Sequence, residues 1–151
     1  MKLSTRSTYG LRAMMALALE YGHGPILLKD IAERQHLPTT YLEQLMVPLR
    51  KARVVTATRG VNGGYVLMRD PEHITLAEVI QVLEGPLELV DCSAVASCHW
   101  NPRSCALKSV LTEVSQLLTD FFSKITLAEL ARQQVVKLQE GEKEPVLSYT
   151  I

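Results

Sequence analysis

All three cysteines of this chain lie within one polar segment, residues 91–105, which reads DCSAVASCHWNPRSC. Five residues separate Cys92 from Cys98, and six separate Cys98 from Cys105. Zinc sites usually pair thiolates with about two to four residues between them, and dithiol enzymes use a Cys-x-x-Cys motif. Iron–sulfur clusters are larger than a single ion and are held by thiolates on loops, which suits the wider spacing. The spacing therefore favours a cluster, while three ordinary free thiols or a thiol redox switch remain as alternatives.

The composition is that of one ordinary domain with a core of its own. The chain has 151 residues, of which 47% are hydrophobic. No uninterrupted apolar run is long enough to cross a bilayer, and the first ten residues lack the apolar stretch of a signal peptide. We therefore expect a cytoplasmic protein with no membrane partner. In that compartment an odd number of cysteines argues against a structural disulfide framework and favours metal, cluster or redox chemistry.

The charges are divided unevenly although the formal net charge is zero. Residues 1–70 carry ten Lys and Arg against five Asp and Glu, and residues 71–151 carry six against eleven. A basic half can meet phosphates, whereas an acidic half suits solubility, dimer contacts or regulation. Two ordinary solvated faces would explain the same division.

Apolar periodicity and turn residues predict a mainly α fold. Helices are expected over residues 4–21, 27–35, 39–51 and 74–86, and a long helix is expected after the cysteine segment. Two β-branched runs, 53–58 and 65–69, flank the turn RGVNGG and predict a hairpin. The order of these elements is that of a winged helix-turn-helix followed by a long helix.

Three Thr-x-x-Glu tetrads mark expected helix starts. They have the spacing of a capping box: Thr40 with Glu43, Thr75 with Glu78, and Thr126 with Glu129. Pro48 is expected to kink the third helix or end it early, because proline lacks a backbone N–H. The long helix has an apolar stripe broader than a small winged domain needs to cover: Val110, Leu111, Val114, Leu117, Leu118, Phe121, Phe122 and Ile125.

The first turns of the third helix hold the residues expected to read DNA bases. In a helix-turn-helix the second helix of the motif enters the major groove with its N-terminal residues toward the base edges. These residues are Thr39, Thr40, Tyr41, Glu43 and Gln44. A glutamine can bond adenine at two atoms, and a threonine can bond either base type or touch a thymine methyl. Glu43 can accept from cytosine, repel phosphates at wrong sites, or only cap its own helix.

The hairpin turn supplies a second expected contact with DNA. Arg59 precedes a tip that contains Gly60 and Gly63. A thin tip can enter a narrow minor groove, whose enhanced negative potential attracts arginine. Arg50, with Lys51 and Arg53, can position the domain on phosphates. The alternative is an ordinary hairpin turn, but its place after a helix-turn-helix and several basic residues favours DNA.

The chain resembles the IscR family of winged helix-turn-helix transcriptional regulators over nearly all of residues 1–139. The likeness is carried by MKLSTRSTYGLRAM, TTYLEQL, LRKARVV, RGVNGGYVL, the cysteine segment and FFSKITLAEL. The resemblance implies a homodimer formed along the long helix, which binds an operator dyad in double-stranded DNA. It also implies one iron–sulfur cluster per subunit, of the [2Fe–2S] type, ligated by Cys92, Cys98 and Cys105.

Two departures from the family pattern leave the fourth ligand open. The second cysteine gap is six residues where the family usually has five, and Lys108 stands where the family has a histidine ligand. A protonated lysine cannot ligate iron. His99 is the nearest imidazole and the candidate fourth ligand, although a solvated loop histidine is an equally good interpretation of it. Asp91 is a further option, as is a group from the partner subunit: some nitric-oxide-sensing relatives use an acidic residue at the position of Thr8.

The sequence thus predicts four parts. Residues 1–85 form a winged helix-turn-helix DNA-binding domain, 86–105 a cluster-binding loop, 106–139 dimerisation helices, and 140–151 a disordered tail. The expected function is a cluster-sensing repressor of iron–sulfur biogenesis genes, and the alternative is a nitric oxide-, iron- or redox-responsive repressor of the same family. An iron–sulfur carrier would leave the hairpin and the basic half unexplained. No placement of Ser, His and Asp forms a catalytic motif, so we do not expect an enzyme.

Overall fold

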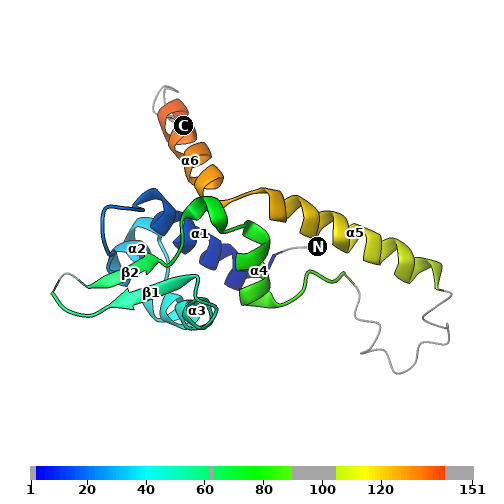
Figure 1. Ribbon diagram of the computed structural model, residues 1–151, viewed down its shortest axis with the longest axis horizontal. Helices are drawn as coiled ribbons and strands as arrows, with labels where there is room; N and C mark the ends of the chain where they lie inside the picture. The colour runs from blue at the N-terminus through cyan, green and yellow to red at the C-terminus, as the bar shows by residue number, and fades with distance from the viewer. Residues whose placement is uncertain (1–2, 62, 90–104, 142–151) are drawn as a thin grey trace, which may run out of the picture.

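The computed structural model describes residues 3–61, 63–89 and 105–141, and it confirms the mainly helical fold. Helix α1, Thr5–Leu19, runs through the middle of the winged domain and packs against α2, α3, α4, α6 and β2 (Figure 1). Its alanines, methionine and leucine favour a helix, and its start is capped by Ser4, whose Oγ accepts from the Ser7 N–H at 3.3 Å. Burial of α1 on several sides makes it the core element of the domain.

Helices α2, Leu28–Gln35, and α3, Thr39–Lys51, form the helix-turn-helix. The turn between them is set by His36, which adopts the left-handed conformation at φ 52°. The Leu37 N–H then returns to the Ala32 carbonyl at 2.8 Å, and both side chains are buried. This arrangement is a Schellman motif with its hydrophobic contact, which fixes the angle between the two helices.

The expected bounds of α3, 39–51, are confirmed, whereas a Thr40 cap and an early end at Pro48 are wrong. The helix begins at Thr39 after Pro38, and no side chain caps its start. Thr40 therefore lies inside the first turn, too late to act as the cap of a Thr40–Glu43 box. The helix also continues past Pro48 to Lys51. Leu49 in that last turn is fully buried, so packing against the core outweighs the one backbone hydrogen bond that proline removes.

The wing is a hairpin of β1, Val55–Thr58, and β2, Gly64–Leu67, as the sequence predicts. A third piece of backbone joins it. Ile26 and Tyr65 exchange two backbone hydrogen bonds, of 3.0 and 2.8 Å. A Cβ on Gly64 would lie 2.4 Å from the Ile26 carbonyl oxygen, so only glycine permits this approach. The wing is thereby tied to the loop after α1.

The two repeated ITLAE segments meet in space. Helix α4, Leu76–Glu84, starts at Thr75, and α6, Leu127–Gly141, starts after Thr126. Each threonine hydroxyl accepts from the N–H three residues on, at 3.2 and 3.1 Å, which confirms both expected caps. Leu76 N–H donates to the Ile125 carbonyl at 2.9 Å, and Leu127 N–H donates to the Ile74 carbonyl at 2.8 Å. The starts of α4 and α6 are thus paired like two short antiparallel strands.

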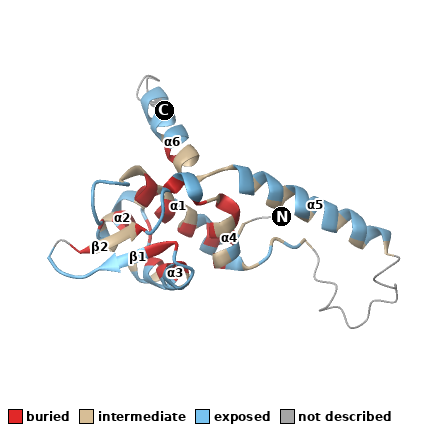
Figure 2. Cartoon of the chain, viewed as in Figure 1, coloured by how far each residue is buried: buried red, intermediate tan, exposed pale blue. Residues whose placement is uncertain are grey.

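Helix α5, Ala106–Lys124, extends away from the winged domain and has no buried residue (Figure 2). It contacts α4, and it joins α6 at the paired segments described above. None of the helices in the described part of the chain is long and apolar enough to span a membrane. Residues 140 and 141 belong to α6, whereas the rest of the expected tail, 142–151, lies outside the described residues.

Candidate DNA-binding surface and cysteine segment

The exposed face of α3 is set by what its other face buries. Four apolar side chains point into the core: Leu42, Leu45, Met46 and Leu49. Because a helix repeats every 3.6 residues, the opposite face must then carry Thr40, Glu43, Gln44, Val47, Arg50 and Lys51. All six are exposed, so three of the five residues expected to read bases face solvent.

The other two residues expected to read bases are partly buried against the rest of the fold. Thr39 and Tyr41 are half-buried. The Tyr41 ring meets the Tyr9 ring of α1 edge to face, with 5.9 Å between ring centroids and 80° between planes. This is a favourable aromatic geometry, and it ties the start of α3 to α1.

The basic residues at the end of α3 lie beside a turn whose backbone is strained. Arg50 and Lys51 occupy the last turn of the helix, and Arg53 follows in the left-handed region at φ 56°. Arg53 N–H donates to the Arg50 carbonyl and Val54 N–H to the Leu49 carbonyl, each at 3.0 Å, which completes a second Schellman motif. Glycine is usual at this position, and another residue costs about 1–2 kcal/mol. The chain instead keeps an exposed cation where α3 passes into the wing.

The wing tip is thin because backbone packs against backbone. Gly63 N–H closes the turn onto the Gly60 carbonyl at 2.9 Å. A Cβ on Gly63 would lie 2.4 Å from the Thr58 carbonyl oxygen, so Gly63 shapes the turn and is itself buried. Arg59, Gly60 and Val61 are exposed beyond this closure. Helix α3 and the hairpin lie beside each other at one end of the molecule, and α3 contacts β1 (Figure 1).

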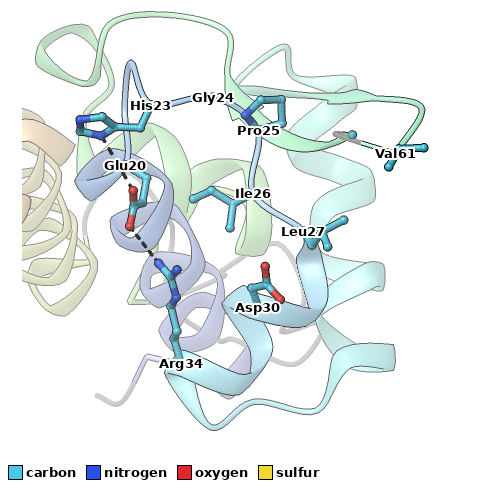
Figure 3. A pocket seen from close by; sticks show the side chains of 10 residues that line it. Glu20, His23, Gly24, Pro25, Ile26, Leu27, Asp30, Arg34 and Val61 are labelled. Carbon is cyan, nitrogen blue, oxygen red and sulfur yellow. Dashed lines mark hydrogen bonds and ion pairs between the residues drawn. The ribbon is translucent and has the colours of Figure 1, made fainter.

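A cleft of about 420 Å³ lies between the wing, α2 and the loop after α1 (Figure 3). Glu20 at the end of α1 pairs with Arg34 of α2 at 2.9 Å and lies 3.8 Å from His23 Nδ1. Asp30 adds a second carboxylate to the lining. The cleft is polar and of mixed charge, and its central ion pair links α2 to α1.

Only one of the expected cluster ligands lies within the described residues. Cys105 is half-buried and immediately precedes α5, while Cys92, Cys98 and His99 lie outside the described residues. Among the described residues no group of three or more His, Cys, Asp or Glu side chains could hold a metal. Lys108 is half-buried in the first turn of α5, one turn beyond Cys105.

The two ends of the cysteine segment are held on the same helix. Leu89 N–H, just before the segment, donates to Ser115 Oγ of α5 at 3.0 Å, and Ser115 Oγ donates to the Leu111 carbonyl at 2.8 Å. At the other end, Cys105 leads directly into α5. The three thiols thus belong to a segment whose entry and exit are both fixed, which fits a compact group bound by all three.

The exit of α4 toward this segment is fastened to the start of α1. Glu84, the last residue of α4, accepts from the Ser4 N–H at 2.9 Å and is also hydrogen-bonded to the Ser4 hydroxyl. The hydroxyl of Ser4 is the main reason that the pKa of Glu84 lies below its usual value. Sequence inspection missed Glu84 and Ser115, because neither belongs to a motif and their partners lie 80 and 26 residues away.

The helix-turn-helix, the three-piece wing and the projecting helix together define a winged-helix regulator. Residues 3–133 match the Rrf2 family, which is described as an iron-dependent transcriptional regulator. The chain belongs to this family, whose members are regulators of transcription rather than enzymes.

Relatives within the family carry two different names at the same level of similarity. The chain is 37% identical over 136 residues to the transcriptional regulator IscR of Xenorhabdus nematophila, covering 90% of this chain and 82% of that one. It is 36% identical over 149 residues to the transcriptional regulator CymR of Bacillus subtilis, covering 99% of both. The family is therefore established, and the signal that this chain senses is a separate question.

Solved structures that carry the same two names are also similar to this chain. The structure of CymR, named the global cysteine regulator of B. subtilis, has a TM-score of 0.76 and 38% identity, covering 88% of this chain and 98% of that one. The structure of IscR from T. potens has a TM-score of 0.73 and 37% identity, covering 99% and 97%. These similarities confirm the winged-helix fold that the sequence predicts.

The strain at Arg53 gives a prediction for stability. Arg53→Gly should be about 1 kcal/mol more stable than Arg53→Ala, because both remove the charge and only glycine relieves the left-handed backbone. Urea unfolding of the two variants measures the difference. At Gln44, in the body of α3, the order should reverse, because glycine weakens a regular helix. Equal stability of the two Arg53 variants would contradict the strain.

Proposed function

We propose that this protein is a homodimeric, DNA-binding transcriptional repressor whose operator affinity depends on an iron–sulfur cluster held by Cys92, Cys98 and Cys105. The observation that carries the DNA-binding part is the placement of α3, with its exposed polar and basic face, beside a hairpin whose tip is exposed. Family membership supports the regulatory role. The expected genes are those of iron–sulfur cluster biogenesis.

Helix α3 and the wing tip suit two different grooves. Thr40, Glu43 and Gln44 would face base edges in the major groove, where glutamine prefers adenine and glutamate prefers cytosine. Glu43 does not cap α3, because Pro38 precedes the helix without a side-chain cap. The carboxylate of Glu43 is therefore available to select among DNA sites. Arg59 would enter the adjacent minor groove, and Arg50 would contact phosphates.

Replacing Arg59 with alanine should weaken binding to a selected operator about tenfold, because the wing loses its charged contact in the minor groove. The operator is a duplex that the wild-type protein selects from a random pool, and fluorescence anisotropy at fixed salt measures its affinity. Lys124→Ala removes the same charge from the end of α5 and should change the affinity less than about twofold. Wild-type affinity in Arg59→Ala would rule out the wing contact.

The apolar stripe on α5 supports a dimer formed along this helix. Its exposed members are Val110, Val114, Leu117 and Phe121, and the exposed Leu107 continues the line toward the start of the helix. Their steps of three and four residues are those of a coiled-coil seam. A stripe of this kind is rarely left in water, and a second copy of the same helix is the partner that its symmetry suits. Dimerisation would place two reading surfaces on half-sites about one helical turn apart.

Leu117→Lys should convert the dimer to a monomer, because it places a charge in the middle of the apolar stripe. Light scattering coupled to gel filtration at several protein concentrations measures the mass. Gln116→Lys adds the same charge one residue away, where Asp120 can pair with it, and should leave the mass unchanged. A dimeric Leu117→Lys protein would place the dimer contact elsewhere.

The cluster part of the proposal rests on the donor set and on the IscR relatives. Three thiolates on one segment with both ends on α5 fit a [2Fe–2S] cluster, one per subunit, with the fourth ligand open between His99, Asp91 and the partner subunit. When bound, the cluster supplies a group whose occupancy and redox state can change. Residues of this chain would then transmit its state: Ser115 holds the segment to α5, and Glu84 joins the end of α4 to α1.

A second candidate is a repressor of the same family that senses oxidants, nitric oxide or iron through the thiols or through a cluster. The equal similarity to CymR supports this candidate, because CymR of B. subtilis is named a global cysteine regulator. Both candidates use the same DNA-binding surface. They differ in the signal that is sensed, and in the thiol form of the second candidate the three cysteines hold no iron.

Anaerobically purified protein should contain iron and acid-labile sulfide in equal amounts, about two of each per chain for a [2Fe–2S] cluster. Cys92→Ala should lose both, together with the visible charge-transfer absorbance, because one thiolate ligand is missing. Ser93→Ala, a change at the adjacent residue, is the control and should retain them. Wild-type protein with neither iron nor sulfide, but with thiol-dependent operator affinity, would instead establish the thiol switch.

A further inference from the structure

A large apolar side chain stands alone at the apex of the wing. Val61 is 101% exposed, which means that no described residue covers it. Turn positions are usually filled by Gly, Pro, Asn, Asp or Ser, whereas β-branched residues favour strands. Neither turn chemistry nor packing against the described residues therefore explains a valine at this position.

The construction of the wing keeps Val61 at the apex. The hydrogen bond from Gly63 to Gly60 closes the turn, and the Ile26–Tyr65 pairing holds β2 close to that turn. Val61 lies at the end of the hairpin and at the rim of the cleft, apart from the Glu20–Arg34 pair (Figure 3). The isopropyl group thus projects beyond the backbone of a tip that is held by the turn hydrogen bond and by the pairing with Ile26.

The chemistry around Val61 indicates what covers it. Arg59, two residues before it, is exposed and cationic, and the backbone between them is a glycine. A thin cationic tip with an apolar apex is complementary to the minor groove, which has anionic edges and a floor of base edges between sugars. In that position the isopropyl group meets the floor of the groove while the guanidinium can bond acceptors or lie near phosphates.

The floor of the minor groove differs between base pairs in one group. A·T and T·A pairs present only acceptors, whereas G·C and C·G pairs add the guanine 2-amino donor. An isopropyl group placed over this donor excludes water and offers it no acceptor, which is costly. We propose that Val61 reads the minor groove by exclusion, so that the base pair beneath the wing apex must lack a purine 2-amino group. This inference rests on the proposed DNA-binding function.

Base analogues that add or remove one amino group in the minor groove test the inference. In the selected operator, each A·T pair is replaced in turn by 2,6-diaminopurine·T, which adds the amino group, and each G·C pair by inosine·C, which removes it. Wild-type protein should lose about tenfold in affinity at one diaminopurine position per half-site, because a buried donor without a partner is created there. Anisotropy at fixed salt measures each duplex.

Val61→Thr is the matched variant, because threonine has nearly the same shape and its hydroxyl can accept from the amino group. The loss at the diaminopurine position should shrink to less than about threefold in this variant. Met68→Thr makes the same kind of change at an exposed apolar residue just after β2 and should retain the wild-type loss.

Two outcomes would overturn the inference. One is a wild-type protein for which every diaminopurine duplex binds equally well. The other is a Val61→Thr protein with the full wild-type loss, which would assign the preference to groove width and Arg59. Loss of operator binding in Arg59→Ala and Gln44→Ala, measured alongside, shows that the surface contacts DNA. If those variants bind normally, the proposed function fails, and not only the role of Val61.

Discussion

The structure depends on the backbone pairing between Ile74–Leu76 and Ile125–Leu127. This pairing joins the winged domain to α5. Two hydrogen bonds of 2.9 and 2.8 Å join these segments, and the side chains of Ile74 and Leu127 are fully buried beside them. The start of α4, the end of α5 and the start of α6 all meet there. Because such a buried pairing has one register, the direction in which α5 leaves the winged domain is set by the core and not by a flexible linker.

This pairing gives the proposed regulation a mechanical basis. Helix α4 is held at its start by the pairing and at its end by Glu84 on Ser4 of α1. The cysteine segment leaves from that end and returns to α5, with Leu89 held on Ser115. A change in the segment would therefore act on α4 and α5, and α4 packs against α1 and α3. Transmission through packed elements of this kind requires differential contacts in the two states, which a bound cluster would supply.

The helix proposed to contact DNA, α3, lies between two turns with a strained backbone. His36 ends α2 and Arg53 ends α3, each in the left-handed conformation that glycine would adopt at lower cost. The Schellman hydrogen bonds and the buried Leu37 and Val54 hold the two turns in place. The turns on either side of α3 thus set its orientation in the fold.

Sequence alone determined the elements and their order: helical periodicity placed α3, the threonine caps placed α4 and α6, and the glycine-rich turn placed the hairpin. It also singled out Cys92, Cys98 and Cys105, because their types and spacing are local properties. Local patterns placed the start of α3 but assigned its cap wrongly, because Pro38 precedes the helix and Thr40 lies inside its first turn. Only the tertiary structure decided which groups meet across long separations: Tyr41 on Tyr9, Ile26 as a third piece of the wing, and Glu84 on Ser4. No period or motif encodes such contacts, since they follow from how the whole core packs around α1.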